Sequence, residues 1–188
     1  MLSEKLKEDT KINHQLLEKK LVHQMRAIHN KHDYGKFLAL FYSFFGGMEV
    51  KIKKHFDQAK LLDYDQRRKT SSLVRDLTYL NEKLPLLAQT NSLPRITNHF
   101  QALGALYVIE GSTLGGRIIS KMLTEQLSMP GFFGMSFFNG YGDQTAIMWE
   151  VFKSALDLQS NNVGYDMIVQ SANDTFTYFS LWFDEQNF

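Results

Sequence analysis

The stretch GALYVIEGSTLGGR, residues 104–117, decides how the chain folds around its centre. Its apolar residues predict a buried helix, yet glycine stands inside it at Gly111, Gly115 and Gly116. An interior glycine costs roughly 0.5–1 kcal/mol relative to alanine, so three within six residues require a reason. The glycines either let something flat and large lie against bare backbone, let the helix kink, or let a second helix pack closely through small residues.

The rest of the chain shows helical periodicity as well. Apolar spacing predicts helices over residues 3–29, 33–56, 65–81, 99–127, 143–158 and 163–183, the second of them interrupted at Gly46-Gly47. There is no internal repeat and no sustained alternating pattern of the kind that strands show. The sequence therefore predicts an all-α protein, a single-domain helical bundle over residues 1–188 that packs around one core.

The composition excludes several kinds of chemistry. The chain of 188 residues contains no cysteine, which rules out disulfides, thiolate-bound iron–sulfur clusters and cysteine nucleophiles. The first residues are charged and lack the apolar segment of a signal peptide. No apolar run approaches the ~20 residues that cross a bilayer. We therefore expect a cytoplasmic protein with no membrane span.

Charge is divided unevenly between the two parts of the chain. Residues 1–75 carry 16 Lys and Arg against 9 Asp and Glu, whereas residues 76–188 carry 5 against 11. The basic part suits an anionic ligand or an acidic partner, or it consists only of solvated helix faces. Nucleic acid is not expected as a partner, because aromatic residues are not interleaved with the basic clusters.

A second informative stretch, LKEDTKINHQLLE at residues 6–18, places His14 on a half-apolar helix face. Glu18 follows at i+4, where its carboxylate can hold one imidazole nitrogen and leave the other free for a metal ion. Lys7 precedes His14 by two turns, about 10 Å along the helix axis. Leu17 and Leu21 add apolar surface. Such pairs are also common on solvated helices, so a surface role for His14 stays open.

The glycine-bearing helix offers a complementary face. Gly111 and Gly115 allow backbone to approach a ligand closely and provide no side chain that could compete as a metal ligand. Ser112 and the neighbouring threonine supply polarity for ordered water. Tyr107, one turn before Gly111, is either a polar contact for the ligand or a core tyrosine.

Other iron and nucleotide sites lack their motifs. Residues 100–188 contain no histidine, so a bis-histidine heme between these two helices is not expected. No Glu-x-x-His motif occurs, so a ferritin-like di-iron site is not supported. The glycine run has no lysine followed by serine or threonine, so it is not a phosphate-binding loop.

Together the two stretches resemble the proximal and distal helices of heme oxygenases of the bacterial type. The proximal match covers residues 6–18 and the distal match residues 106–116, with weaker similarity at 34–38, 67–77 and 172–182. The resemblance implies an all-α fold with His14 as the axial iron ligand and Glu18 as its partner. It also implies propionate contacts at Lys7 and Tyr107, a catalytic pocket at Gly111, Ser112 and Gly115, and a further heme contact at Gly116.

The resemblance further implies a reaction. Heme, as substrate and cofactor together, would be opened at a meso carbon to biliverdin, carbon monoxide and ferrous iron. Electrons would come from an external donor such as a ferredoxin or flavodoxin-type protein. The mammalian-type enzymes have an aspartate where this chain has Ser112, and bacterial members lack it too. Two alternatives stay open, namely a non-catalytic heme carrier or sensor and a non-heme enzyme on the same scaffold.

Overall fold

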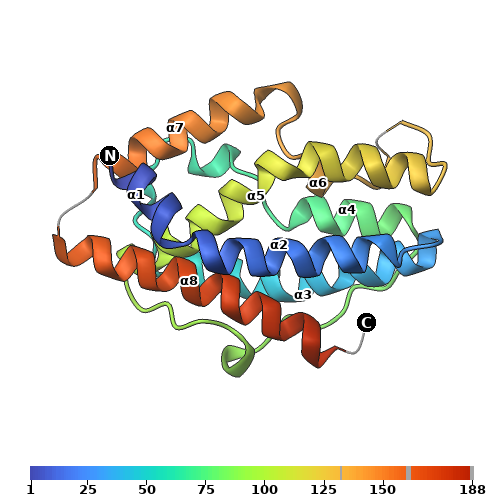
Figure 1. Ribbon diagram of the computed structural model, residues 1–188, viewed down its shortest axis with the longest axis horizontal. Helices are drawn as coiled ribbons and strands as arrows, with labels where there is room; N and C mark the ends of the chain where they lie inside the picture. Colours follow the sequence, from blue (N-terminus) through green and yellow to red (C-terminus); the bar gives the residue numbers. More distant parts are fainter. Residues whose placement is uncertain (132, 160–161, 187–188) are drawn as a thin grey trace.

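The computed structural model describes residues 1–131, 133–159 and 162–186, and helices account for most of them (Figure 1). No strand occurs in these described ranges, so the predicted all-α fold is confirmed. The α-helices are α1 (Leu2–Asp9), α2 (Lys11–Arg26), α3 (Lys31–His55), α4 (Ser71–Tyr79), α5 (His99–Gln126), α6 (Ser136–Asn139), α7 (Thr145–Asp157) and α8 (Asn162–Glu185). Short 3-10 turns lie at Gln58–Lys60, Tyr64–Gln66, Thr90–Ser92 and Gly142–Gln144.

The core is built mainly from aromatic rings that α3, α6 and α8 direct toward one another. The Phe41 ring lies 5.0 Å from the Phe179 ring in an edge-on arrangement, and the Phe44 ring lies 4.7 Å from it. Such pairs contribute about 0.5–1.5 kcal/mol each beyond the area that they bury. Helix α5 runs through the molecule and packs against α8, α6, α7 and α3. The glycine-bearing helix is therefore the central element of the fold.

Two helix boundaries differ from the expectation. The predicted helix over residues 3–29 is divided at Thr10, whose φ of −107° departs from helical geometry and whose side chain is buried. The predicted helix over 65–81 begins only at Ser71. The residues before it are extended at Arg67, with ψ of 147°, because both Arg67 and Arg68 donate side-chain hydrogen bonds to distant elements.

The predicted interruption at Gly46-Gly47 is wrong, because α3 continues through both residues. A loop crosses α3 here instead: the Ala88 amide donates to the Ser43 carbonyl at 2.9 Å. A Cβ atom at Gly47 would come within 2.6 Å of the Ala88 carbonyl oxygen. Gly47 is therefore small because backbone lies directly against it, and Gly46 is small because the Leu87 side chain packs there.

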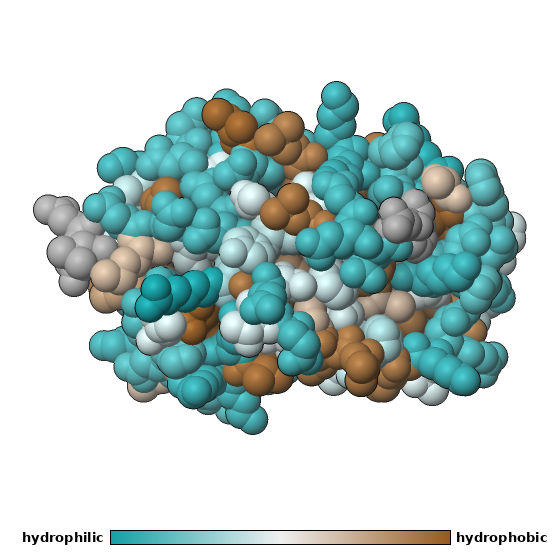
Figure 2. Space-filling view, turned by 90° about the horizontal axis from the view of Figure 1, so that it is seen from below, coloured by the Kyte–Doolittle hydropathy of each residue, from teal (hydrophilic) through white to brown (hydrophobic). Residues whose placement is uncertain are grey.

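The surface is mainly hydrophilic. Figure 2 shows polar side chains over most of one face, with apolar side chains in separate groups between them. Among the described residues, none of the helices combines the length and the apolar character needed to cross a membrane.

Candidate functional site

Helices α2 and α5 approach each other near both ends. At one end the Tyr107 side chain lies close to the Thr10 side chain. At the other, Gln126 Nε2 donates to the carbonyl oxygens of Met25, at 3.4 Å, and of Ile28. Figure 1 shows α5 changing direction along its length.

The three glycines of α5 have different surroundings. A Cβ atom at Gly115 would meet nothing within 4 Å, and one at Gly111 would lie 3.6 Å from the edge of the Trp149 ring, an ordinary contact. A Cβ atom at Gly116 would overlap the Phe138 carbonyl of α6. Gly111 and Gly115 therefore have free space beside them. Gly116, predicted to contact heme, is instead packed closely against α6.

His14 lies on the solvent-exposed side of α2. Its side chain is exposed, and its ring lies 5.5 Å from the Phe176 ring of α8. His14 follows Thr10 by one turn, as Gly111 follows Tyr107 by one turn. Thr10 and Tyr107 lie close together, and both helices run in the same direction in Figure 1.

The predicted partners of His14 are exposed. Glu18 lies one turn further along α2, and in the described part of the chain no hydrogen bond joins it to His14. Lys7 lies in the last turn of α1, with its side chain in solvent. The roles of Glu18 and Lys7 stay predictions.

Tyr107 is buried rather than exposed to a ligand. Its ring lies 5.6 Å from the Trp149 ring, and only 8% of the residue is accessible. Burial raises the pKa of Tyr107, while its hydrogen bond with Thr10 works in the opposite direction. Tyr107 therefore joins α5 to the start of α2, and its predicted propionate contact stays a prediction.

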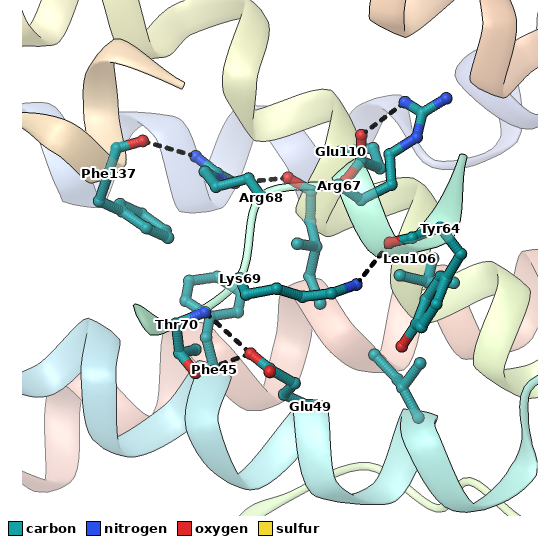
Figure 3. Close-up of a pocket in the computed structure, with 12 residues that line it drawn as sticks. Phe45, Glu49, Tyr64, Arg67, Arg68, Lys69, Thr70, Leu106, Glu110 and Phe137 are labelled. Carbon is teal, nitrogen blue, oxygen red and sulfur yellow. Dashed lines mark hydrogen bonds and ion pairs between the residues drawn. The ribbon is translucent and has the colours of Figure 1, made fainter. Parts of the chain in front are cut away.

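Sequence reasoning missed a buried ionic cluster behind the glycine face of α5 (Figure 3). Arg67 Nη1 donates to Glu110 Oε2 at 2.9 Å, and Arg67 Nη2 donates to Asp63 at 2.7 Å. Tyr141 donates its hydroxyl to the same Glu110 carboxylate at 2.9 Å. Burial lowers the pKa of Arg67, but the attraction and hydrogen bonds of Glu110 and Asp63 together outweigh burial, and the net shift is upward. The available signal was a glutamate inside an apolar helix, which calls for a buried cation.

Arg68 reaches α5 from the same segment. Its Nη2 donates to the Ile109 carbonyl at 2.7 Å and to Ser112 Oγ at 2.6 Å, and its Nη1 donates to the Phe137 carbonyl at 3.0 Å. The guanidinium lies 4.0 Å over the Phe137 ring. Burial lowers the pKa of Arg68 to about 10, against the attraction of Glu110, so Arg68 remains charged at neutral pH. Extra donors on a helical carbonyl favour a bend, and here they act beside Gly111.

The family model described as heme oxygenase matches residues 1–185. The chain belongs to the heme oxygenase family. A heme oxygenase of Xanthomonas campestris pv. campestris is 30% identical over 118 residues, which cover 62% of this chain and 67% of that protein. The chain is thus an enzyme of heme degradation, and heme is its substrate.

Solved heme oxygenase structures share the fold. The NO- and CO-bound enzyme of Neisseria meningitidis superposes with a TM-score of 0.83 at 23% identity, covering 98% of this chain and 91% of that one. The enzyme of Leptospira interrogans gives 0.77 at 20% identity, covering 98% of both chains. Heme oxygenase-1 of Synechocystis, solved in complex with heme, gives 0.77 at 21%, covering 98% and 91%.

The residues of this chain fit a heme between α2 and α5. An exposed imidazole stands on α2, and α5 has glycine backbone with free space beside Gly115. Phe176 and Trp149 supply aromatic surface next to His14 and Gly111 respectively. A flat apolar ligand with one metal coordination position suits this arrangement.

Proposed function

We propose that the protein opens heme at one meso carbon, giving biliverdin, carbon monoxide and ferrous iron, with the heme held between α2 and α5. The observation that carries the proposal is an exposed histidine, His14, on α2 together with free space beside Gly115 on α5. This arrangement provides one metal ligand from α2 and none from the glycines of α5.

Each predicted site residue then has a positional role. His14 binds the iron through one imidazole nitrogen, and Glu18 turns toward the other nitrogen and fixes the tautomer. Lys7 meets a propionate from the end of α1. Tyr107 approaches the propionate edge while its hydroxyl keeps α5 tied to Thr10.

When bound, heme supplies both the iron that activates oxygen and the carbon that is oxidised. The chain contributes shape and hydrogen bonding. Gly111 and Gly115 keep side chains away from the distal side, and Ser112 offers an exposed hydroxyl to water there. Trp149 limits how far a ligand can extend along α5 beyond Gly111.

The sequence carries no nucleotide-binding motif, so we propose that an external protein supplies the electrons. A ferredoxin or flavodoxin-type donor is the natural class, since such proteins are acidic and residues 1–75 are basic. We place the reaction in the cytoplasm, a reducing compartment that suits a chain without cysteine.

A single-turnover experiment tests the proposal. Ferric heme is titrated into the protein, then a reductant is added in air and the absorption spectrum is followed. We expect stoichiometric binding, loss of the main heme band, the spectrum of a linear tetrapyrrole, and iron that a ferrous chelator can trap. Tight binding of heme that survives the reductant would favour a carrier or sensor. A protein that does not bind heme would favour a non-heme enzyme.

A further inference from the structure

The hydroxyl of Ser112 has a restricted set of hydrogen-bonding positions. A serine hydroxyl has one hydrogen and two lone pairs, whereas a guanidinium only donates. Arg68 Nη2 lies 2.6 Å from Ser112 Oγ, so it occupies one lone pair. The hydroxyl hydrogen points to the Ile109 carbonyl oxygen at 2.7 Å. One lone pair remains, and Ser112 is exposed.

We propose that Arg68 converts Ser112 into an acceptor-only group on the open side of α5, with the hydrogen-bonding character of a carboxylate but without its charge. Arg68 is then a positioning residue for the reaction, because it acts through Ser112. The inference rests on the proposed function, since the molecule that Ser112 holds would be water beside the heme.

The guanidinium is well placed to hold this geometry. It bridges α5 and α6 through the carbonyl oxygens of Ile109 and Phe137 and stacks on the Phe137 ring. A guanidinium held at several points presents its N–H groups in fixed directions, which an ammonium group does not. Moving Nη2 away from Ser112 would therefore break the contacts with both helices.

The Nε atom of Arg68 is a further point at which the guanidinium can be held. It is buried and has no protein partner in the described part of the chain. Beside it is a cavity of about 20 Å³, lined by residues that include Glu49, Lys69 and Glu110 (Figure 3). This volume admits one water molecule, and Arg68 Nε offers it a hydrogen-bond donor. A water bonded to Nε would fix the last free donor direction of the guanidinium.

The consequence concerns the direction of a hydrogen bond. A water molecule next to Ser112 must donate to it, because Ser112 has no hydrogen left to give. Its oxygen and second hydrogen then point toward other partners on the open side of α5. Without Arg68, the hydroxyl could rotate and donate to the water, which would reverse this orientation.

The test uses two substitutions of equal size at Ser112. Aspartate accepts hydrogen bonds only, whereas asparagine also carries an N–H₂ group. Arg68→Met should slow single-turnover heme opening by about tenfold, the loss expected for one oriented hydrogen bond. Ser112→Asp should restore the rate in the Arg68→Met protein, because aspartate needs no clamp. Ser112→Asn in the same protein should not restore it. The Kd for heme should be similar in these two double variants.

A heme-free measurement accompanies the rates. Ser112→Asp should raise the Tm when Arg68 is present, through a new ion pair, and this gain should disappear with Arg68→Met. If the wild-type protein fails to open heme, the proposed function fails, and this thermal cycle still reports on the contact between Arg68 and Ser112. A Tm gain that does not depend on Arg68 would show that the clamp is absent and would overturn the inference.

Two kinetic results would also overturn it: full activity of Arg68→Met, or equal rescue by aspartate and asparagine. If Arg68→Met does not fold, the comparison is made with Arg68 in place. In the protein that retains Arg68, Ser112→Asp should open heme about tenfold faster than Ser112→Asn at similar heme affinity. Equal rates in that pair would contradict the proposal.

Discussion

At the scale of single residues, His14 combines exposure with a nearby aromatic ring, and its imidazole makes no hydrogen bond in the described part of the chain. Both of its nitrogens are therefore available, and the approach of Glu18 requires only a side-chain rotation. This freedom is what an axial ligand needs before the heme arrives.

We expect His14→Ala to lower heme affinity by at least about tenfold and to remove the absorption features of imidazole-bound iron. Free imidazole should bring those features back. Glu18→Gln should have a smaller effect, because it weakens the partner and keeps the ligand. The matched control is His23→Ala, which changes another exposed histidine of α2. Equal behaviour of the His14 and His23 variants in a heme titration would reduce His14 to a surface residue.

Glu110 is a second important residue, and its role is to stabilise the fold. Its carboxylate is buried and accepts hydrogen bonds from Arg67 and Tyr141. Glu110→Gln leaves a buried guanidinium with less compensation, so the free energy of unfolding should fall by about 3 kcal/mol. Urea unfolding of the heme-free protein measures it. Glu125→Gln, at an exposed position of the same helix, should change the free energy by less than about 0.5 kcal/mol.

At the scale of elements, the surroundings of the α5 glycines predict opposite effects at neighbouring positions. Gly115→Ala should stabilise the heme-free protein by about 0.5–1 kcal/mol, because the helix gains propensity and the new methyl group meets nothing. Gly116→Ala should destabilise it, because the methyl group would overlap the Phe138 carbonyl. Thermal unfolding of the two variants decides whether the glycines differ in this way.

The larger substitution Gly115→Leu separates folding from binding. It should leave the heme-free fold intact, since leucine is a good helix former, and prevent heme from seating against α5. Normal heme opening by a folded Gly115→Leu protein would mean that no ligand lies against this part of the helix.

The sequence allowed the helices to be predicted but not where some of them break. Periodicity is a property of neighbours in the chain, so α3, α5 and α8 were expected close to their observed bounds. The break at Thr10 and the late start of α4 depend on partners about 40 to 100 residues away, Tyr107 for Thr10 and Glu110 for Arg67. The contact of Arg68 with Ser112 in the site could not be predicted for the same reason, since the two residues are 44 positions apart in the chain.

At the scale of the whole molecule, the uneven charge gives a prediction about the electron donor. An acidic donor should be attracted to residues 1–75, so its rate of electron delivery should fall several-fold between low and physiological ionic strength. Lys19→Glu, on exposed α2, should slow delivery at low salt, whereas Lys83→Glu, in the acidic part of the chain, should not. A rate of electron delivery that does not change with salt would mean that the basic residues of 1–75 do not attract the donor and are only solvated helix faces.

The two contacts between α2 and α5 also bear on how the product leaves. Heme is flat, but a ring-opened tetrapyrrole coils and becomes thicker than the ring from which it came. Contacts at both ends resist the widening that its exit requires, so we expect departure to be faster when one of them is removed. Gln126→Ala removes the contact at the Met25 end. Gln126→Ala should speed repeated turnover while leaving the first ring opening at its original rate. The slow step of the enzyme would then be release of the product and not the opening of the ring.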